Sequence, residues 1–519
     1  MSEPISNQRA SSLDWMAVLG PCIGAFMALL DITMANSSIF KIQGTLGAGI
    51  EEGSWIMTSY LVGEIIAIPI TGWFSTVFSY RRYLLFNIFF FVFFSILCGM
   101  ARSLPVMIFA RFFQGLAGGP LVPLAASAVM TRLPLSQRPL GLSIFSLAIA
   151  LGPTLGPSFG GWVSSQYGWP YSFYLNLFPG LLIWGLIYHS YEKVPMKLNL
   201  LKDGDWSGMA AMAVCMASLT FVLEEGNRKD WFGDKTIIRG TMICLVSFIM
   251  FIWIELKTKN PFIHLRLFLK RNFLLATAAG TLITGFILSN LYILPSYLLQ
   301  IQGYDAFEVG KVALWSGPIQ IPMTLAVPLL VKRIEARWLI VVGCLSLFTS
   351  CYINSGMTNL TASDQFIIPQ LLRAFGLSLA LGPLAGMALA DVELKDMGSA
   401  VGLYNLMRTL GGSLAIAGLG TVLSHRYIFH FSRIAEKVTE TNYVVADMLE
   451  RSSSLYSSKI LDGNKQAVLM LGKIINREAY IMAYADVYLA LSLSIFVVIF
   501  LVLTIRVRKT PGVGAPADH

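Results

Sequence analysis

The sequence carries little charge: only 13% of its residues are Asp, Glu, Lys or Arg, whereas ordinary soluble domains have about 25%. Its five histidines form no metal-ligand cluster, and its six cysteines include no C-x-x-C pair. No G-x-x-x-x-G-K-[ST] phosphate loop and no H-E-x-x-H motif occurs. These absences argue against a soluble enzyme, a disulfide framework, a zinc site and an ATP-driven pump. We expect neither a metal nor a cofactor.

Long hydrophobic runs fill the chain instead. Hydrophobic residues make up 55% of its 519 positions. Apolar stretches of roughly 20 residues, the length that crosses a bilayer as a helix, recur from one end to the other. We count fourteen such spans and predict an all-α polytopic protein in a lipid bilayer. The first stretch, from Trp15, lacks a small-residue cleavage site, so we interpret it as a retained span rather than a signal peptide.

The distribution of basic residues predicts the topology. An even number of spans places both termini on one side, and that side carries 20 lysines and arginines against seven in the short connections opposite. Basic residues gather on the cytoplasmic side, so both termini are predicted to be cytoplasmic. This bias accounts for most of the net charge of +9, and a nucleic-acid partner is not needed to explain it.

The spans divide the chain into groups. We assign a leader 1–14, a six-helix half 15–190, two inserted spans in 207–256, an interfacial segment 257–272, a second six-helix half 273–505 containing a long loop 424–481, and a tail 506–519. The interfacial segment mixes aromatic and basic residues, which suits a helix or strand lying on the cytoplasmic surface. The long loop is polar and lies on the outer side; a loop of that length usually has its own structure or a partner, so it is either a docking surface or an ordinary solvated loop.

A weak internal repeat relates the fourth span to the twelfth. Arg111–Leu121 recurs as Arg373–Leu384 with one extra residue, which sets the two arginines 262 positions apart. The same offset carries Gly156 onto Gly418. Duplicated halves are typical of transporters that bind substrate between them, near the middle of the membrane. We therefore predict two related halves with two inserted central helices.

The fifth span contains a run of glycine and proline. Glycine at every fourth position removes side chains from one helix face, so another backbone can approach it closely. Each proline deletes a helical hydrogen bond and favours a bend. We assign a conformational role to Gly152, Gly156, Pro157, Gly160 and Gly161.

Ionisable residues inside spans are costly and are therefore candidates for function. Asp31 lies toward the outer end of the first span, where it either faces the central cavity or reaches outer water. Glu64 lies near the middle of the second span, where it is either a structural hydrogen-bonding group or a functional carboxylate that is neutral in one conformation and ionised in another. Arg111 keeps its proton at any relevant pH, so it can hold a proton site but cannot carry the proton. Arg373 and Arg408 are as consistent with a structural role as with a functional one.

Several of these residues form motifs of a known family. Leu30–Asn36 resembles an L-D-x-T-x-V-N pattern, with Ala in place of the valine, and Arg111-x-x-Gln114-Gly resembles a fourth-span arginine motif. The glycine-proline run resembles a fifth-span antiporter motif. Asn176-Leu-Phe-Pro-Gly180 matches N-x-P-x-G in part, because its proline is one place late. Together these motifs resemble the fourteen-span drug/proton antiporters of the major facilitator superfamily, the EmrB-like branch.

The loop after the second span departs from this family. Thr76 stands where the usual G-x-L-A-D-R-x-G-R-K sequence has its aspartate, so the charge relay associated with that aspartate is in doubt. Arg81 and Arg82 are interpreted either as cytoplasmic anchors or as plain positive-inside residues.

The resemblance implies an inner-membrane, proton-coupled antiporter that exports small amphipathic compounds. It favours a proton-coupling role for Asp31 and Arg111, and the position of Glu64 near mid-membrane assigns Glu64 to the same role. We assign substrate-cavity or supporting roles to Asn36, Gln114, Arg373, Asn405 and Arg408. The resemblance also implies a periplasmic adaptor protein and an outer-membrane channel as partners.

Two other functions stay open. The same fold can export one native metabolite, such as a siderophore or fatty acid, and the sequence does not separate this from multidrug efflux. A non-transporting membrane sensor is expected to lose the buried charges or gain a soluble signalling domain, and this chain does neither.

Overall fold

The computed structural model describes residues 10–202, 204–258, 264–393, 396–439, 443–457 and 463–505. Its α-helices are α1 (Ser12–Ser37), α2 (Ile39–Leu46), α3 (Ile50–Val77), α4 (Tyr80–Gly99), α5 (Leu104–Gly118), α6 (Leu121–Arg132), α7 (Arg138–Gln166), α8 (Pro170–Tyr174), α9 (Leu177–Ser190), α10 (Trp206–Gly226), α11 (Lys235–Lys257), α12 (Arg271–Gln300), α13 (Ala306–Leu314), α14 (Gly317–Val331), α15 (Ala336–Asn354), α16 (Ile367–Leu389), α17 (Met397–Ala435), α18 (Tyr443–Ser457) and α19 (Gly463–Thr504). Short 3-10 turns are η2 (Leu198–Leu201), η3 (Trp231–Gly233), η4 (Leu265–Leu269) and η5 (Ser363–Phe366).

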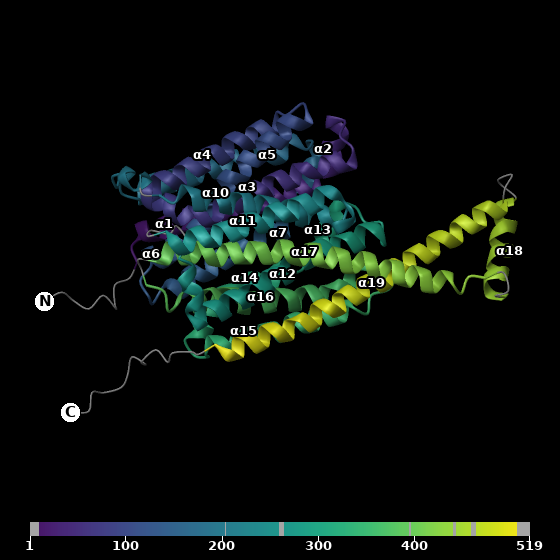
Figure 1. Ribbon diagram of the computed structural model, residues 1–519. Coiled ribbons are helices and arrows are strands. Elements are labelled where there is room, and N and C mark those ends of the chain that lie inside the picture. Colours follow the sequence, from purple (N-terminus) through teal and green to yellow (C-terminus); the bar gives the residue numbers. More distant parts are fainter. Residues whose placement is uncertain are drawn as a thin grey trace.

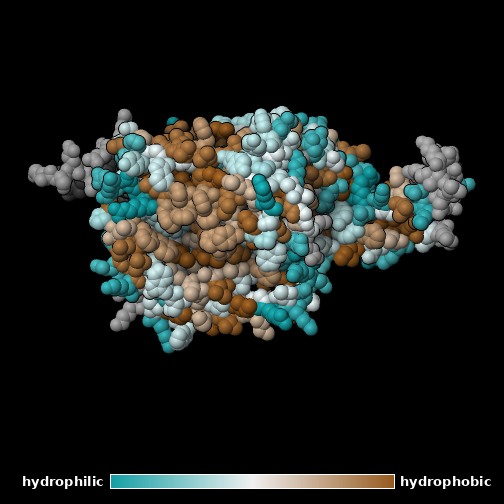
Figure 2. All heavy atoms as spheres, turned by 90° about the horizontal axis from the view of Figure 1, so that it is seen from above, coloured by the Kyte–Doolittle hydropathy of each residue, from teal (hydrophilic) through white to brown (hydrophobic). Residues whose placement is uncertain are grey.

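The helices form one elongated bundle (Figure 1). Helix α1 begins and α19 ends at the same end, which we call the terminal end, and α18 lies beyond the opposite end, which we call the hairpin end. Within the described residues, fourteen helical segments are long and apolar enough to cross a membrane, as the sequence predicts. Figure 2 shows hydrophobic side chains around the middle of the bundle and hydrophilic ones toward its ends, which is the pattern of a membrane-embedded surface.

The two predicted halves pack in the same way. In the first, α1 lies along α7 and α9, and α5 lies along α3 and α4; in the second, α12 lies along α17 and α19, and α16 lies along α14 and α15. The inserted helices α10 and α11 pack on each other, and α10 also contacts α3 and α17, one helix from each half. The structure is therefore two similar six-helix groups with an inserted pair against them.

Three spans are broken where the sequence prediction made them continuous. The fourth divides into α5 and α6 at Gly119–Pro120, the sixth into α8 and α9 at Leu175–Asn176, and the tenth into α13 and α14 at Trp315–Ser316. Pro120 is part of the first break and Pro318 lies just inside α14 after the third, and proline cannot donate to the helical hydrogen-bond ladder. The break in the sixth span sets the position of a polar side chain described below.

Most described residues of the predicted outer loop 424–481 are helical, so this connection has a structure of its own. Helix α17 continues to Ala435, α18 follows, and α19 already begins at Gly463. The two long helices are held together beyond the last apolar turns by tyrosine stacking, with the rings of Tyr427 and Tyr480 4.1 Å apart between centroids. Figure 1 shows this arm, the α17–α19 hairpin, projecting from the bundle.

The terminal-end segments are only partly described. Helix α1 begins within the predicted leader 1–14, because Ser11 and Asp14 form a capping box in which each side chain accepts the other's backbone N–H. In the predicted interfacial segment 257–272, η4 is a short turn whose Leu267 is buried in the core. Residues 1–9, 259–263 and the tail 506–519 lie outside the described residues.

Candidate functional site

Close approach of α3 and α5 builds the centre of the first half. A β-carbon at Gly115 would overlap the carbonyl oxygen of Tyr60, and one at Gly119 would lie 2.5 Å from the carbonyl oxygen of Glu64. Glycine at these positions lets the two backbones touch, as small residues do at tight helix contacts in membranes. This packing brings one face of α5, including Arg111, against α3.

Arg111 forms a buried ion pair with Asp31. The Arg111 Nη1 lies 2.7 Å from an Asp31 carboxylate oxygen, and the two side chains are 0% and 1% exposed. Two charges enclosed in this way stay ionised only if each is neutralised and hydrogen-bonded by the other and by its surroundings. The pair connects α1 to α5 across 80 positions of sequence.

Neutral polar side chains form further hydrogen bonds to this pair. The Gln114 side-chain oxygen accepts a second hydrogen bond from Arg111 Nη1 at 2.8 Å. Asn176 donates to the other Asp31 oxygen at 2.5 Å and also to the Ser95 hydroxyl at 2.9 Å. We call Asp31, Arg111, Gln114, Asn176 and Ser95 the charge cluster. It draws on α1, α4, α5 and the break between α8 and α9, all in the first half.

Aromatic rings cover the guanidinium of Arg111. Its central carbon lies 4.3 Å from the ring centroid of Tyr60 and 5.6 Å from that of Phe173. Its Nε donates a long hydrogen bond of 3.4 Å to the backbone carbonyl of Ile56. The rings exclude water and supply cation–π attraction, so the positive charge is fixed in place.

Glu64 lies one helical turn from Tyr60, at the middle of α3. Its side chain is buried, at 7% exposure, yet within the described part of the chain no hydrogen bond or ion pair engages its carboxylate. Its backbone is held by the contact with Gly119. A buried carboxylate without an ion-pair partner is costly in a membrane, which makes Glu64 a candidate for a functional group.

The glycine-proline run packs α7 directly on α1, next to Asp31. A β-carbon at Gly156 would overlap the Thr33 hydroxyl, one at Gly152 would lie 2.9 Å from the Leu29 β-carbon, and one at Gly160 would lie 2.6 Å from the Met34 α-carbon. Both prolines, including Pro157, lie inside the continuous helix α7, and Gly161 is half-buried beside them. The run therefore fixes α7 against the helix that carries Asp31.

The second half has buried arginines but a different environment for them. Arg373 donates to Gln370 at 2.8 Å, and Arg408 donates to Thr284 at 2.9 Å and to Asn405 at 3.5 Å. Among the described residues neither has a carboxylate within ion-pair distance. The second half lacks a counterpart of the Asp31 carboxylate, because the position that the repeat offset matches to Asp31 is the apolar Ile293.

Two predicted residues lie away from these clusters. Asn36 is exposed at the end of α1 and does not join the charge cluster. At Gly418, the repeat counterpart of Gly156, a β-carbon would meet nothing within 4 Å. The matching contact is at Gly411, where a β-carbon would lie 2.6 Å from the carbonyl oxygen of Thr281 on α12. The repeat offset therefore matches the fifth span to the thirteenth, but the close contact in the thirteenth span lies two helical turns from the position that the offset gives.

The residues at the junction of α3 and α4, at the terminal end, make structural contacts. Thr76 donates to the carbonyl of Gly72 at 3.0 Å within its own helix. Arg81 is buried, donates to the carbonyl of Tyr188 at 2.9 Å and lies 4.8 Å from the centroid of that ring. Arg81 thus joins α4 to α9, whereas Arg82 is exposed.

Sequence reasoning missed two members of the charge cluster. Asn176 enters the sequence argument only through a partial motif, and Ser95 does not enter it. Both are uncharged, so a ranking of span residues by charge gives them no weight. An uncharged amide or hydroxyl costs far less in a membrane and leaves a weaker signal. The useful signal is an asparagine placed at a helix break in the sixth span.

Comparison with known proteins places the chain among transporters. The "Colistin resistance protein EmrB" of Acinetobacter baumannii is 28% identical over 488 residues, 94% of this chain and 95% of that protein. The "Fatty acid resistance protein FarB" of Neisseria gonorrhoeae is 28% identical over 492 residues, 95% and 96% of the two chains. The solved proton:xylose symporter XylE shares the fold with a TM-score of 0.58 at 14% identity, covering 96% of this chain and 97% of that one.

The family assignment rests on a match that runs through most of the chain. Residues 22–416 match the sequence pattern of the Major Facilitator Superfamily. This range begins in α1, ends in α17 and includes the charge cluster, the glycine-proline run and both inserted helices. The protein belongs to the Major Facilitator Superfamily.

Proposed function

We propose that this protein is a proton-coupled antiporter that exports amphipathic drugs or other toxic compounds across the inner membrane. The observation that carries the proposal is the presence of two buried carboxylates in the same half of the bundle. Asp31 is paired with Arg111, and Glu64 is buried without an ion-pair partner. In this proposal Glu64 takes up and releases the proton, and the charge cluster sets the electrostatic field in which it does so. The names of the relatives, which record resistance to colistin and to fatty acids, support export of toxic compounds.

The proposal predicts that Glu64→Gln abolishes coupling. An amide has the shape of the acid but cannot titrate, so we expect the variant to insert normally while transport driven by a pH gradient falls to the rate without a gradient. The measurement is uptake of a fluorescent amphipathic dye into inside-out proteoliposomes with and without an imposed gradient. Asp364→Asn, which changes an exposed carboxylate at the hairpin end, is the matched control and should transport normally. Wild-type coupling in the Glu64 variant would remove Glu64 from the mechanism.

A second candidate is export of one native metabolite, and the likeness to a fatty acid resistance protein favours a fatty acid. The two candidates differ in breadth. A deletion strain complemented with this chain should regain resistance to several unrelated dyes and uncouplers under the first proposal. Under the second it should regain resistance to long-chain fatty acids alone.

The proposed topology places the terminal end in the cytoplasm and the α17–α19 hairpin in the periplasm. In support of this, basic residues gather in the connections at the terminal end. From residue 424 to Ala435 helix α17 adds about 18 Å, and from Gly463 to residue 479 helix α19 adds about 25 Å, at 1.5 Å per residue. An arm of that length can reach a protein in the periplasm.

We further propose that this arm docks a periplasmic adaptor that passes substrate to an outer-membrane channel. The arm exposes large apolar side chains outside the bundle: Phe429 on α17 is 45% exposed, and Val468 and Leu469 on α19 are 58% and 53% exposed. Exposed apolar side chains on a projecting, water-facing helix are typical of a protein interface. An adaptor with a complementary apolar helix face would cover them.

The docking proposal predicts that the double variant Val468→Gln with Leu469→Gln lowers whole-cell resistance without lowering transport by the isolated pump. We expect weaker crosslinking to the adaptor and lower whole-cell resistance, because the apolar contact is lost, with unchanged transport by the isolated pump. Lys473→Gln, an exposed change on the same helix, is the control. If crosslinking and resistance both persist in the double variant, the arm has another role.

A further inference from the structure

A groove on the side of the first half, toward the terminal end, has the composition of a site for a hydrocarbon chain. Its volume is about 500 Å³. Helices α3 and α4 form its two sides, and α5, which lies along both, closes its back at Leu116. All of its lining residues are apolar or aromatic except Arg82 and Asn87. The Asn87 amide already donates to the carbonyl of Tyr83 at 2.7 Å within α4. We call this cavity the α3–α4 groove.

The groove opens on the surface that faces lipid. Phe86 in its wall is 59% exposed, and this residue lies in a segment of α4 that is apolar enough to cross a membrane. The opposite wall is held in place by aromatic packing, because the ring of Phe74 stacks on those of Phe78 and Tyr83. An apolar cavity offers water no hydrogen-bond partners and stays dry. In a bilayer, a lipid chain is therefore the occupant that such a groove favours.

The length of the groove matches the depth of one leaflet. Along α3 its lining runs from Ile66 to Phe78, the residue that ends the helix, which is about 18 Å at 1.5 Å per residue. Half of the hydrocarbon core of a bilayer is about 15 Å thick. Ile66 lies two positions after Glu64, near the middle of α3. An acyl chain that enters at the terminal end would thus extend to the middle of the membrane.

A cation lies at the end of the groove nearest the membrane surface. Arg82 is exposed in the first turn of α4, and among the described residues no carboxylate pairs with it. Arg81 differs, because it is buried and donates to the carbonyl of Tyr188. The exposed residue Lys197 is nearby, since its backbone N–H donates to the carbonyl of Val77 at 2.8 Å. Arginine is well suited to a phosphate group, with which its planar guanidinium forms two parallel hydrogen bonds.

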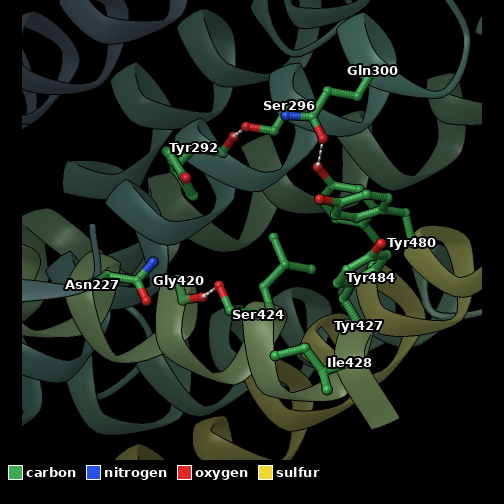
Figure 3. A pocket seen from close by; sticks show the side chains of 11 residues that line it. Asn227, Tyr292, Ser296, Gln300, Gly420, Ser424, Tyr427, Ile428, Tyr480 and Tyr484 are labelled. Carbon is green, nitrogen blue, oxygen red and sulfur yellow. Dashed lines mark hydrogen bonds between the residues drawn. The ribbon is translucent and has the colours of Figure 1, made fainter. Parts of the chain in front are cut away.

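A pocket at the hairpin end has a different chemistry. Figure 3 shows its polar side chains, among them Tyr484, whose hydroxyl donates to Gln300 at 3.1 Å. Four tyrosines, two amides and two serines line that pocket. The α3–α4 groove instead combines one cation at the membrane surface with an apolar channel below it. This arrangement matches a molecule with an anionic head and a hydrocarbon tail.

We propose that the α3–α4 groove binds one acyl chain of an anionic phospholipid, with the headgroup phosphate on Arg82. The lipid is a bound component of the leaflet at the terminal end and is not exported. The site depends on the proposed topology only for the name of that leaflet, the cytoplasmic one, and does not depend on proton-coupled export. The bound chain would pack against the part of α3 that follows Glu64.

The test is photolabelling of the full-length protein in phosphatidylcholine proteoliposomes. The probe is a trace of phosphatidylglycerol with a diazirine in one acyl chain, and the labelled residues are located by mass spectrometry. Phosphatidylcholine with the same diazirine chain is the comparison of equal shape without net charge. In the wild-type protein we expect phosphatidylglycerol to label the lining of the groove more strongly than phosphatidylcholine does. Arg82→Gln should lower labelling by phosphatidylglycerol about fivefold, equivalent to about 1 kcal/mol, and leave labelling by phosphatidylcholine unchanged.

Two further variants control for charge in general. Arg82→Lys keeps a cation at the mouth of the groove and should retain most of the labelling by phosphatidylglycerol. Arg333→Gln removes an exposed arginine from the corresponding connection of the second half, between α14 and α15, and should not change labelling of the groove. A loss in Arg333→Gln equal to that in Arg82→Gln would show a general surface charge effect and would overturn the proposal.

A fourth variant tests the apolar part of the site. Ala67 lines the groove, so Ala67→Phe places a ring where the chain would lie and should lower labelling by both lipids. Unchanged labelling by phosphatidylglycerol in Arg82→Gln, or loss of groove labelling when an amphipathic dye is added in excess, would overturn the proposal. The second result would make the groove an entry site for transported compounds. Labelling needs no proton gradient, so failure of the export function would not alter these outcomes.

Discussion

Replacing Asp31 with asparagine is expected to abolish gradient-driven export and to destabilise the protein more than any other conservative change in the first half. Arg111 is 0% exposed and has Asp31 as its partner at 2.7 Å, so the substitution leaves a buried positive charge without its counterion. Removing one member of a buried pair costs about 3–5 kcal/mol. The expected result is a lower melting temperature of the purified protein in detergent and transport at the background rate.

The double variant Asp31→Asn with Arg111→Gln separates stability from function. Removing both charges relieves the uncompensated charge, so the melting temperature should recover toward the wild-type value, because paired removal is often close to neutral. Transport should stay absent, because the field of the ion pair is gone. The coupling between the two positions is read from the full double-mutant cycle. Additive effects, or wild-type transport by Asp31→Asn, would show that the pair does not have the role assigned to it.

The sequence singles out the charged side chains that the structure brings together, Asp31 and Arg111, but not the neutral ones around them. Asp31 and Arg111 were found because an ionised side chain in a span is expensive and therefore rare. Their partner Asn176 is 145 positions from Asp31, and its contact with it depends on the break between α8 and α9. Rules that consider only neighbouring residues do not predict a contact between residues so far apart in the sequence.

The same limit applies at the hairpin end, where the sequence does not show that the connection between the last two spans is helical. Hydropathy identifies a span only while the helix is in lipid, so α17 and α19 were ended where their sequences turn polar. Both helices continue past the predicted ends of their spans, and they pack on each other, through Tyr427 and Tyr480 among others. The polar connection between the last two spans has the composition of a loop, but its described residues form a helical hairpin. The pairing that stabilises it is tertiary and was not visible in either segment alone.

The repeat likewise predicted which helices correspond but not their packing register. The offset that joins Arg111 to Arg373 also pairs the fifth span with the thirteenth, and α7 and α17 do pack on equivalent partners, α1 and α12. The close contacts differ, since Gly156 meets Thr33 whereas the tight contact in the second half is at Gly411.

This difference in register supplies a matched pair of variants for the conformational role of α7. Gly156→Leu places a side chain where even a β-carbon would overlap the Thr33 hydroxyl, two residues from Asp31. Overpacking of a tight contact costs about 1–3 kcal/mol and forces the backbones apart. We expect the variant to reach the membrane but to lose transport, because α1 and α7 can no longer pass through the closely packed state. Transport in proteoliposomes and surface expression are the two measurements.

Gly418→Leu makes the same chemical change in the corresponding span of the other half. A β-carbon there meets nothing within 4 Å, so we expect expression and transport close to those of the wild type. The comparison separates the loss of a close helix contact from the general cost of a larger residue in a membrane helix. A partial reversal by Thr33→Ala in the Gly156→Ala background would identify the Thr33 contact as the cause. Equal transport by the Gly156 and Gly418 leucine variants would mean that close approach of α1 and α7 is not needed for the transport cycle.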